Sequence, residues 1–259
     1  MKKRSVHHYL IRAEQLGVEP NFFMSEPYLQ LSNVRVEEKK GWIWLTDKRW
    51  CLFPPLPMEN PGEYPDVRIW ALFKNDTVSL NGHYSFLDWQ YVFDPNGFQN
   101  MTGKHWQVFR KNCRKWSKNN PGWKYENTPP SGTDAGMLIA DWLERKGGSA
   151  LDPELLARFA YFEDDKNIFR KFLYNKEGEL MAINAWDENW KYINYRICIV
   201  NTDQPFLDEF VRWLFYTDLK IRRSGKFVND GGTLDSPGLE RFKDKMNPIE
   251  KIPLYSWIK

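Results

Sequence analysis

The sequence has few of the residues from which many catalytic and metal centres are built. Its 259 residues include three cysteines and four histidines. Cys51, Cys113 and Cys198 lie far apart, and none belongs to a Cys-x-x-Cys or Cys/His pair. We therefore expect reduced, mostly buried thiols, with neither a disulfide framework nor a zinc site. His7 and His8 are adjacent and would not converge on a helix, so no metal is expected there either.

Long apolar segments are also missing. No run approaches the roughly 18 residues that a membrane-spanning helix needs, and the basic N-terminus does not lead into a signal peptide. These absences predict a soluble, cytoplasmic protein without a transmembrane segment. The net charge is only +3, so any affinity for nucleic acid or other anions has to come from a local patch.

Several widespread catalytic motifs do not occur. The sequence contains no Gly-x-Ser-x-Gly, no P-loop, no His-Glu-x-x-His and no dinucleotide-binding glycine fingerprint. Three of the four histidines lie at or before His83, which argues against a Ser-His-Asp triad. The common hydrolase, nucleotide-binding and zinc-protease classes are therefore disfavoured.

Aromatic residues, by contrast, are plentiful. They make up 16% of the chain, with 13 tryptophans, and the hydrophobic content of 42% is enough for one large domain or two smaller ones. A short helix is expected after Ser5, and short apolar segments separated by turns then predict a meander of strands. The expected strands of this first part are residues 34–36, 42–45, 50–53, 68–73 and 84–93.

A basic helix is predicted over residues 102–118. Its apolar residues recur at helical spacing on one face, and no acidic residue occurs in the segment. One interpretation is a solvated basic surface over a packed apolar face. The other is a surface for phosphates of tRNA, DNA or a lipid headgroup, because basic helices neutralise closely spaced negative charge. The candidate substrate-binding residues are Lys104, Arg110, Lys111, Arg114 and Lys115.

The second part of the chain alternates strands and helices. The expected strands are residues 123–127, 168–174, 180–186, 190–200, 226–229 and 252–257, and the expected helices are residues 133–145, 204–223 and segments starting at Asp152 and Ser236. This alternation predicts an α/β layered sheet with ligands at the strand ends. A loop rich in Gly and Asp follows Asn229 and precedes a helix, so we expect a binding or catalytic site there.

This order of elements resembles the GNAT acyltransferase fold over residues 123–258. Two segments look like those of the C-terminal domain of phosphatidylglycerol lysyltransferases. The first is residues 103–126, which include Gly103-Lys104, Arg110-Lys111-Asn112 and Asn120-Pro121-Gly122-Trp123. The second combines Phe227-Val228-Asn229-Asp230-Gly231-Gly232 with Ser236-Pro237-Gly238-Leu239, Lys245 and Pro248.

The resemblance implies an α/β (α+β) fold with a GNAT-like mixed sheet flanked by helices. It also implies two GNAT-like halves in tandem, as in Fem-type aminoacyl transferases. Residues 1–102 would form a reduced, degenerate half, because residues 57–81 leave little room for a helix pair. Residues 103–259 would form the catalytic half.

The donor-binding turn departs from acetyl-CoA-dependent relatives. In those relatives a glycine-rich turn brings backbone N–H groups to the pyrophosphate at a helix N-terminus. Residues 201–206 occupy that place here, with Thr202 and Gln204 as candidate donor-binding residues, but they contain Asp203 and Pro205 and no glycine. The resemblance therefore favours an aminoacyl-tRNA over an acyl-CoA as the activated donor.

The chemistry that the resemblance implies is attack of an amine or hydroxyl on an activated carbonyl, with no cofactor or metal required. Asp230 is the first candidate for base or substrate-amine anchor, although it could equally cap its own loop. Tyr195 is the candidate acid or a packing residue, and Asn229 could orient the substrate or hold the loop. Trp186 could stack on a base or sugar or belong to the core.

The leading hypothesis is an acyltransferase that moves an acyl or aminoacyl group to a lipid headgroup, a peptide amine or a modified nucleobase in DNA. A polyanionic substrate, tRNA or DNA, fits the basic helix. The alternative is a non-catalytic nucleic-acid-binding module on an inactivated GNAT scaffold. The missing glycine turn supports this alternative, whereas the Gly- and Asp-rich loop after Asn229 argues against it.

Overall fold

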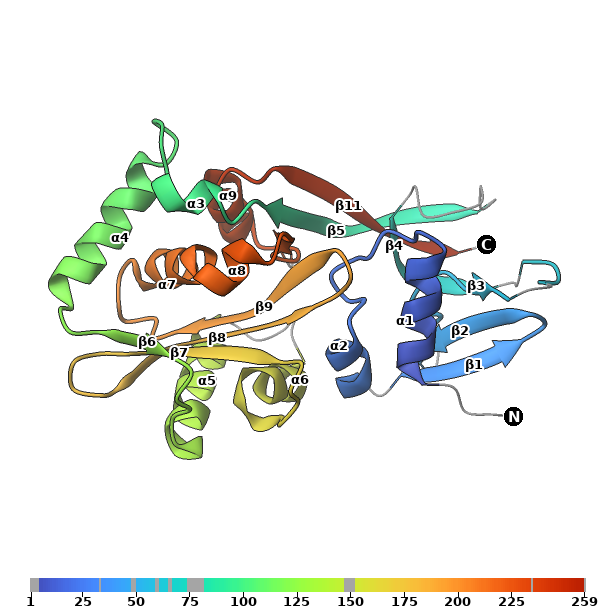
Figure 1. The fold of residues 1–259 in the computed structure, drawn as a ribbon, viewed down its shortest axis with the longest axis horizontal. Coiled ribbons are helices and arrows are strands. Elements are labelled where there is room, and N and C mark those ends of the chain that lie inside the picture. Colours follow the sequence, from blue (N-terminus) through green and yellow to red (C-terminus); the bar gives the residue numbers. More distant parts are fainter. Residues whose placement is uncertain are drawn as a thin grey trace. The chain divides into compact units, whose positions relative to one another are not determined.

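A computed structural model describes residues 5–32, 34–47, 50–58, 61–64, 67–73, 82–146, 152–233 and 235–258. The chain forms two compact units (Figure 1). Unit 1 comprises Met1–Gln90 and Lys251–Lys259, and unit 2 comprises Tyr91–Glu250. The assignment of two GNAT-like halves to residues 1–102 and 103–259 stays a prediction.

Unit 1 combines two helices with short antiparallel strands. The helices are α1 (Val6–Gln15) and α2 (Glu26–Leu31), and β1 (Arg35–Lys39), β2 (Trp42–Thr46) and β3 (Leu56–Pro57) form a three-stranded sheet. β4 (Arg68–Phe73) pairs antiparallel with β11 (Glu250–Ile258). β5 (His83–Phe93) leads from this unit into unit 2.

The hairpin of β1 and β2 follows from its turn residues. Lys39 pairs with Trp42, so the loop contains only Lys40 and Gly41. Both have positive φ angles, 51° and 79°, which is the backbone that a tight two-residue turn needs to match strand twist. The turn expected between the strands at residues 34–36 and 42–45 is therefore confirmed.

The expected strand over residues 50–53 is wrong. Cys51 makes only isolated bridges, to Thr46 and to Ile69. Backbone bonds of Cys51 and Leu52 reach both β2 and β4, so this segment crosses between two strands instead of extending one. The proline pair that follows cannot donate to a ladder, and the edge position of the sheet goes to β3.

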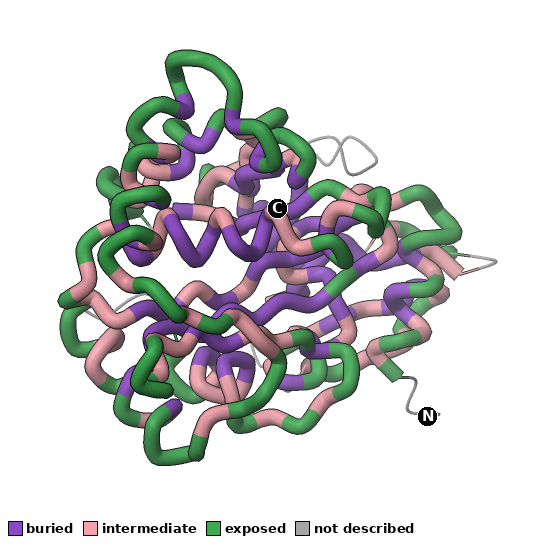
Figure 2. Tube along the Cα trace, turned by 60° about the vertical axis from the view of Figure 1, so that its left-hand side comes forward, coloured by how far each residue is buried: buried purple, intermediate pink, exposed green. Residues whose placement is uncertain are grey.

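The sheet of unit 2 is mixed, as predicted. Its strands lie in the order β5, β10, β9, β8, β7, β6, and every pair is antiparallel except β9 with β10. Their bounds are β6 Lys124–Glu126, β7 Phe169–Tyr174, β8 Leu180–Glu188, β9 Tyr192–Val200 and β10 Phe227–Asn229. Figure 2 shows buried stretches running through the central strands and exposed stretches in the loops.

Helices cover both faces of this sheet. α4 (Gln107–Asn119) and α7 (Leu207–Thr217) lie on one side of β6 to β9, and α5 (Gly132–Lys146) and α6 (Pro153–Ala157) lie on the other (Figure 1). A π-helical turn, η1 (Arg158–Phe162), continues α6. The remaining helices are α3 (Gly97–Asn100), α8 (Leu219–Arg223) and α9 (Pro237–Lys245).

The helix predicted over residues 204–223 is two helices. Asp218 has φ −58° and ψ 133°, which is not helical, and its side chain accepts a hydrogen bond from the Lys220 backbone N–H. Its carboxylate also meets the Lys171 ammonium of β7 at 2.5 Å. This cap and ion pair end α7 and begin α8, although the apolar spacing of the sequence continues through the break.

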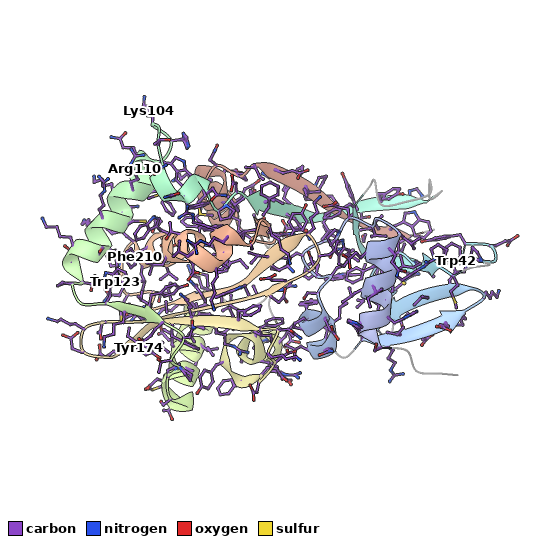
Figure 3. All side chains as sticks on the ribbon, viewed as in Figure 1. Trp42, Lys104, Arg110, Trp123, Tyr174 and Phe210 are labelled. Atoms are coloured by element: carbon purple, nitrogen blue, oxygen red, sulfur yellow. The ribbon has the colours of Figure 1, made fainter. Side chains whose placement is uncertain are left out.

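The two faces of α4 are divided as the sequence predicts. Phe109, Cys113 and Trp116 are buried, and Trp116 stacks on Phe210 of α7 with ring centroids 4.4 Å apart. Figure 3 places Phe210 on α7 and Lys104 pointing away from the protein just before α4. The apolar face of α4 therefore belongs to the core of unit 2.

Truncation of Trp116 tests this division. Trp116 is 2% exposed, so Trp116→Ala should lower the free energy of unfolding by roughly 3–5 kcal/mol, since it removes a large buried side chain. Val108 of the same helix is 60% exposed, and Val108→Ala should change stability by no more than about 0.5 kcal/mol. Urea denaturation measures both values, and equal losses would contradict the assignment.

Candidate functional site

The parallel strands β9 and β10 diverge after a short pairing. They are in register only from Phe227 opposite Tyr192 to Asn229 opposite Asn194. β9 then runs on to Val200, whereas the chain after β10 turns toward β5, with the Asp230 N–H bonded to the Tyr91 carbonyl at 2.9 Å. Open parallel α/β sheets bind ligands beyond the carboxyl ends of their strands, and by analogy we take the carboxyl end of this parallel pair as the candidate site.

A β-bulge lies in β9 next to the divergence. Ile197 pairs with Ala185 and Tyr195 with Trp186, so Arg196 is an extra residue on β9. Bulges re-aim side chains and occur often beside active sites. Here the bulge places the side chain of Tyr195 on the α7 side, where its ring stacks on Phe215 at 4.0 Å.

Asp230 is the centre of a buried charged cluster. Arg212 of α7 donates to its carboxylate, and the Tyr216 hydroxyl donates to the same oxygen at 3.0 Å. The Lys243 ammonium of α9 lies 3.2 Å from the other carboxylate oxygen. The side chains of Asp230 and Lys243 are only 3% and 2% exposed, so two cations and one carboxylate share a largely dry environment.

The pKa shifts in this cluster follow from burial and from Asp230. Burial, the largest single influence, disfavours the charged form of Arg212, but Asp230 and the other neighbouring groups together outweigh it and raise the pKa of the guanidinium. Burial, followed by the negative charge of Asp230, raises the pKa of the Tyr216 phenol well above its ordinary value. Arg212 therefore stays charged and Tyr216 stays protonated as a hydrogen-bond donor.

Lys243 also holds the loop that follows β10. Its ammonium donates to the carbonyl oxygens of Asp230, Gly231 and Gly232, the last at 2.7 Å. α9 can place it there because Ser236 caps the helix by accepting from the Leu239 N–H, just after the loop ends. The loop backbone is thus held both by the Lys243 side chain and by backbone hydrogen bonds of Asp230 and Gly231 to Tyr91 of β5.

Tyr195 lies beside this cluster but its hydroxyl points elsewhere. The hydroxyl donates to the Asn184 side-chain oxygen at 2.5 Å, and the Asn184 amide donates to the Tyr125 hydroxyl at 2.7 Å. The Arg212 guanidinium carbon lies 5.2 Å from the centre of the Tyr195 ring. Burial raises the pKa of Tyr195 well above its ordinary value, so this phenol is a poorer acid than a free tyrosine.

Asn229 lies within a row of buried polar residues on the central strands. Its side-chain oxygen accepts from the Gly231 N–H at 2.9 Å, which supports the loop-holding interpretation. Its register partner Asn194 donates to Asp187 at 2.8 Å, and Asp187 also forms an ion pair with Arg196 at 2.9 Å. The Asn194 side-chain oxygen is buried and has no hydrogen-bond partner among the described residues.

Trp186 lies in the core. It is 6% exposed, and its ring contacts Phe169 and Phe215 at centroid distances of 5.8 and 5.3 Å. This position agrees with the packing interpretation, which competes with stacking on a substrate.

The proposed donor turn carries negative charge. Thr202 and Gln204 are half-buried, and Asp203 is exposed and bonded to Arg145 at 3.0 Å. Phe206 precedes α7 in a left-handed conformation, φ 70°, and offers no side-chain cap. The first turn of α7 adds two further acids, Asp208 and Glu209, so the positive end of the helix dipole is opposed by carboxylates.

The basic residues of the sequence-predicted set separate into two groups. Lys104, Lys111, Arg114 and Lys115 are exposed. Arg110 is half-buried, and its guanidinium donates to the carbonyls of Met101 and Gly103, the second at 3.1 Å (Figure 3). Arg110 therefore supports the turn before α4, whereas the exposed residues are open to a partner.

Among the described residues, no group of three His, Cys, Asp or Glu side chains could hold a metal ion. Nor is any helix in the described ranges long and apolar enough to cross a membrane.

Sequence reasoning missed Arg212, Tyr216 and Lys243. Arg212 and Tyr216 lie in α7, which buries nearly every residue from Phe210 onward. A single arginine within an apolar helical run was the pattern that could have marked the cluster, since buried charges need a partner. No comparable pattern marks Lys243 in the polar sequence of α9.

Neutralising Asp230 should leave two buried cations without their carboxylate. Asp230→Asn is expected to lower the free energy of unfolding by roughly 3–5 kcal/mol, as is typical when one partner of a buried ion pair is removed. Asp164→Asn, at an exposed carboxylate, is the control and should stay within about 0.5 kcal/mol. Guanidinium denaturation measures the difference, and a fully stable Asp230→Asn protein would disprove the cluster.

Glu209 should make stability depend on pH. Burial, with a contribution from neighbouring Asp208, raises the pKa of Glu209 from 4.5 to about 7. Between these values the folded protein binds more protons than the unfolded chain, so its stability should fall as the pH rises from about 4.5 to about 7. Melting temperatures across this range should show a weaker decline for Glu209→Gln. An unchanged decline would show that another group is responsible.

No family profile and no curated protein matches the sequence. Solved structures do match the fold. A conserved protein of unknown function from Bacteroides thetaiotaomicron aligns with a TM-score of 0.74 at 13% identity, over 100% of this chain and 99% of that one. L-PGS from Bacillus licheniformis aligns with a TM-score of 0.66 at 15% identity, over 100% and 93%.

Two further structures agree. The C-terminal domain of a putative lysylphosphatidylglycerol synthetase from Agrobacterium fabrum gives a TM-score of 0.65 at 13% identity, over 98% of this chain and 92% of that one. FemX gives 0.50 at 14% identity, over 73% and 66%. Identities this low show the fold alone. The protein therefore has the mixed α/β fold of lysylphosphatidylglycerol synthetase C-terminal domains and of FemX, as its motifs predict.

Proposed function

We propose that this protein transfers an aminoacyl group from an activated ester donor to a hydroxyl or amine. The observation that carries the proposal is the divergence of β9 and β10 beside the buried cluster of Asp230, Arg212 and Lys243. This arrangement occurs in a fold shared with lysylphosphatidylglycerol synthetase, whose name describes the transfer of lysine to a lipid.

In the proposed reaction the acceptor oxygen or nitrogen forms a bond to the donor carbonyl carbon, and the ester C–O bond breaks. The proton of the acceptor ends on the departing hydroxyl. The negative charge that develops on the carbonyl oxygen needs preorganised donors. We assign that role to Arg212, because a guanidinium has several N–H groups and its side chain keeps 10% exposure beside Asp230.

Asp230 then acts as a positioning residue and not as the general base. Its carboxylate is held by Arg212, Tyr216 and Lys243. The excess positive charge around it disfavours a further ammonium group, so we do not assign it as a substrate-amine anchor. Tyr195 shapes the wall beside Arg212, since its hydroxyl is committed to Asn184.

The donor that we propose is an aminoacyl-tRNA. The turn at residues 201–206 lacks one backbone N–H at Pro205 and carries carboxylates where a pyrophosphate would bind. The acceptors that we propose are a lipid-headgroup hydroxyl or a peptide amine. A nucleobase acceptor in DNA has no support from the fold comparisons.

Transfer can be tested with bulk tRNA charged with labelled amino acids. The protein should move label to phosphatidylglycerol vesicles or to a short peptide with a free amine, as detected by mass spectrometry of the acceptors. Arg212→Lys keeps the charge but loses the forked donors, so kcat should fall at least about tenfold while KM changes little. Label transfer at the wild-type rate by Arg212→Lys would refute the assigned role.

Acetyl-CoA should bind weakly or not at all. Isothermal titration of the protein with acetyl-CoA should give no saturable heat at micromolar ligand, because negative charge and a missing N–H oppose phosphate binding at the turn. Micromolar affinity would overturn the preference for a tRNA donor.

A non-catalytic nucleic-acid-binding module is the second candidate. Two observations favour it, the turn without glycine and the full engagement of Asp230 by its neighbours. The transfer experiment separates the two functions: tight RNA binding with no mass gain on any acceptor would select the binding module.

A further inference from the structure

The exposed side of α4 and the strand after it carry a concentrated positive charge. We define the basic face as six exposed residues that share a cationic side chain: Lys104, Lys111, Arg114, Lys115, Lys118 and Lys124. No acidic residue occurs in the sequence from 102 to 125. Within this stretch the positive charge is therefore not balanced, and the first acid after it is Glu126.

The cations of the basic face are not neutralised by ion pairs within the described residues. In the described part of the chain, no residue of the basic face forms a salt bridge with a carboxylate. Lys115 lies over the ring of Phe206 at 4.9 Å, a contact that leaves the ammonium at the surface. Glu209 of α7, an acid that contacts α4, is partly buried and bonded to Asn112 at 2.9 Å.

The geometry of the helix sets a regular spacing. Lys111, Lys115 and Lys118 follow one another at four and three residues, so they line one side of α4. A 13-residue helix is about 20 Å long, which is the scale of several consecutive phosphates. A row of point charges at this spacing matches a nucleic-acid backbone better than a single small anion.

The apolar side of α4 is not available for a membrane. Phe109, Cys113 and Trp116 are buried against the core of unit 2, and Val108 is the exposed large apolar residue that the described helix retains. Helices that bind bilayers insert an apolar face below the headgroups. α4 offers charge without such a face, which favours a hydrophilic polyanion.

The basic face also adjoins the elements of the candidate site. Trp116 of α4 stacks on Phe210 of α7, and Arg212 follows on the same helix and reaches Asp230. Lys115 contacts Phe206, the residue that begins α7. A polyanion on α4 would therefore be held beside the helix that carries the proposed oxyanion donor.

We infer that the basic face is the docking surface for the phosphate backbone of an RNA, and that it holds the RNA part of the donor during transfer. This inference rests on the proposed function for the identity of the donor. The basic face would contact phosphates and not bases. Binding should therefore be insensitive to the sequence of the RNA and sensitive to the salt concentration.

The test uses the full chain and uncharged bulk tRNA as the probe, with binding followed by fluorescence anisotropy. If four cations each neutralise a phosphate, log Kd against log salt should have a slope near 3 to 4. A fourfold rise in salt should then weaken binding roughly 10²-fold. The triple variant Lys111→Gln, Arg114→Gln, Lys118→Gln should lower this slope by about 2 to 3 and weaken binding at low salt at least tenfold.

A charge-matched control separates a local surface from net charge. The triple variant Lys146→Gln, Lys166→Gln, Lys245→Gln removes the same charge from exposed positions outside the basic face, and it should bind tRNA like the wild type. Equal losses in both triple variants, or a salt-independent affinity in the wild type, would overturn the inference. Unchanged melting temperatures confirm that both variants are folded.

The tRNA-binding and aminoacyl-transfer experiments test the docking surface and the proposed function separately. Suppose that tRNA binding is salt-sensitive and needs the basic face, but no acceptor is modified. This result would contradict the proposed function and support the docking surface. Suppose instead that the basic-face variant transfers the aminoacyl group with an unchanged KM for charged tRNA. This result would contradict the docking surface and support the proposed function. Binding of the wild type to phosphatidylglycerol vesicles, lost in the same variant and without tRNA affinity, would also overturn the inference.

Discussion

The structure of the candidate site depends on the burial of one carboxylate between two cations. Asp230 directly follows β10, and the residues that neutralise it come from α7 and α9. A carboxylate in a dry environment is costly unless it is paired and hydrogen-bonded, so these three segments have to fold together. The same contacts that satisfy Asp230 fix Arg212 beside the diverging strands and Lys243 under the loop.

The sequence was informative where a local pattern reports a local structure. The hairpin at Lys40 and Gly41, the two faces of α4 and the position of the loop after Asn229 all follow from turn residues or from helical spacing. The motif resemblance predicted the fold relatives correctly. It did so because the strand, loop and helix around Asp230 are contiguous in the chain.

The sequence did not predict the features that depend on contacts between residues far apart in the chain. The break at Asp218 depends on Lys171 of β7, which is distant in sequence, and the apolar spacing of α7 gives no warning of it. Arg212 and Lys243 matter only because they meet at Asp230. Arg110 has a side chain suited to binding phosphate, but its guanidinium donates hydrogen bonds to two backbone carbonyls instead. The candidate residues therefore included Asp230 but not the three side chains that contact its carboxylate.

The hydrogen bonds from Lys243 to the carbonyl oxygens of Asp230, Gly231 and Gly232 make the loop and α9 one cooperative unit. Backbone hydrogen bonds to Tyr91 of β5 hold the start of this loop, and an ammonium from a later helix additionally holds three of its carbonyls. Any loosening of α9 is therefore transmitted to the end of β10 without a change in the loop itself. Grafting this loop onto another scaffold would fail unless the helix that carries the lysine were moved with it.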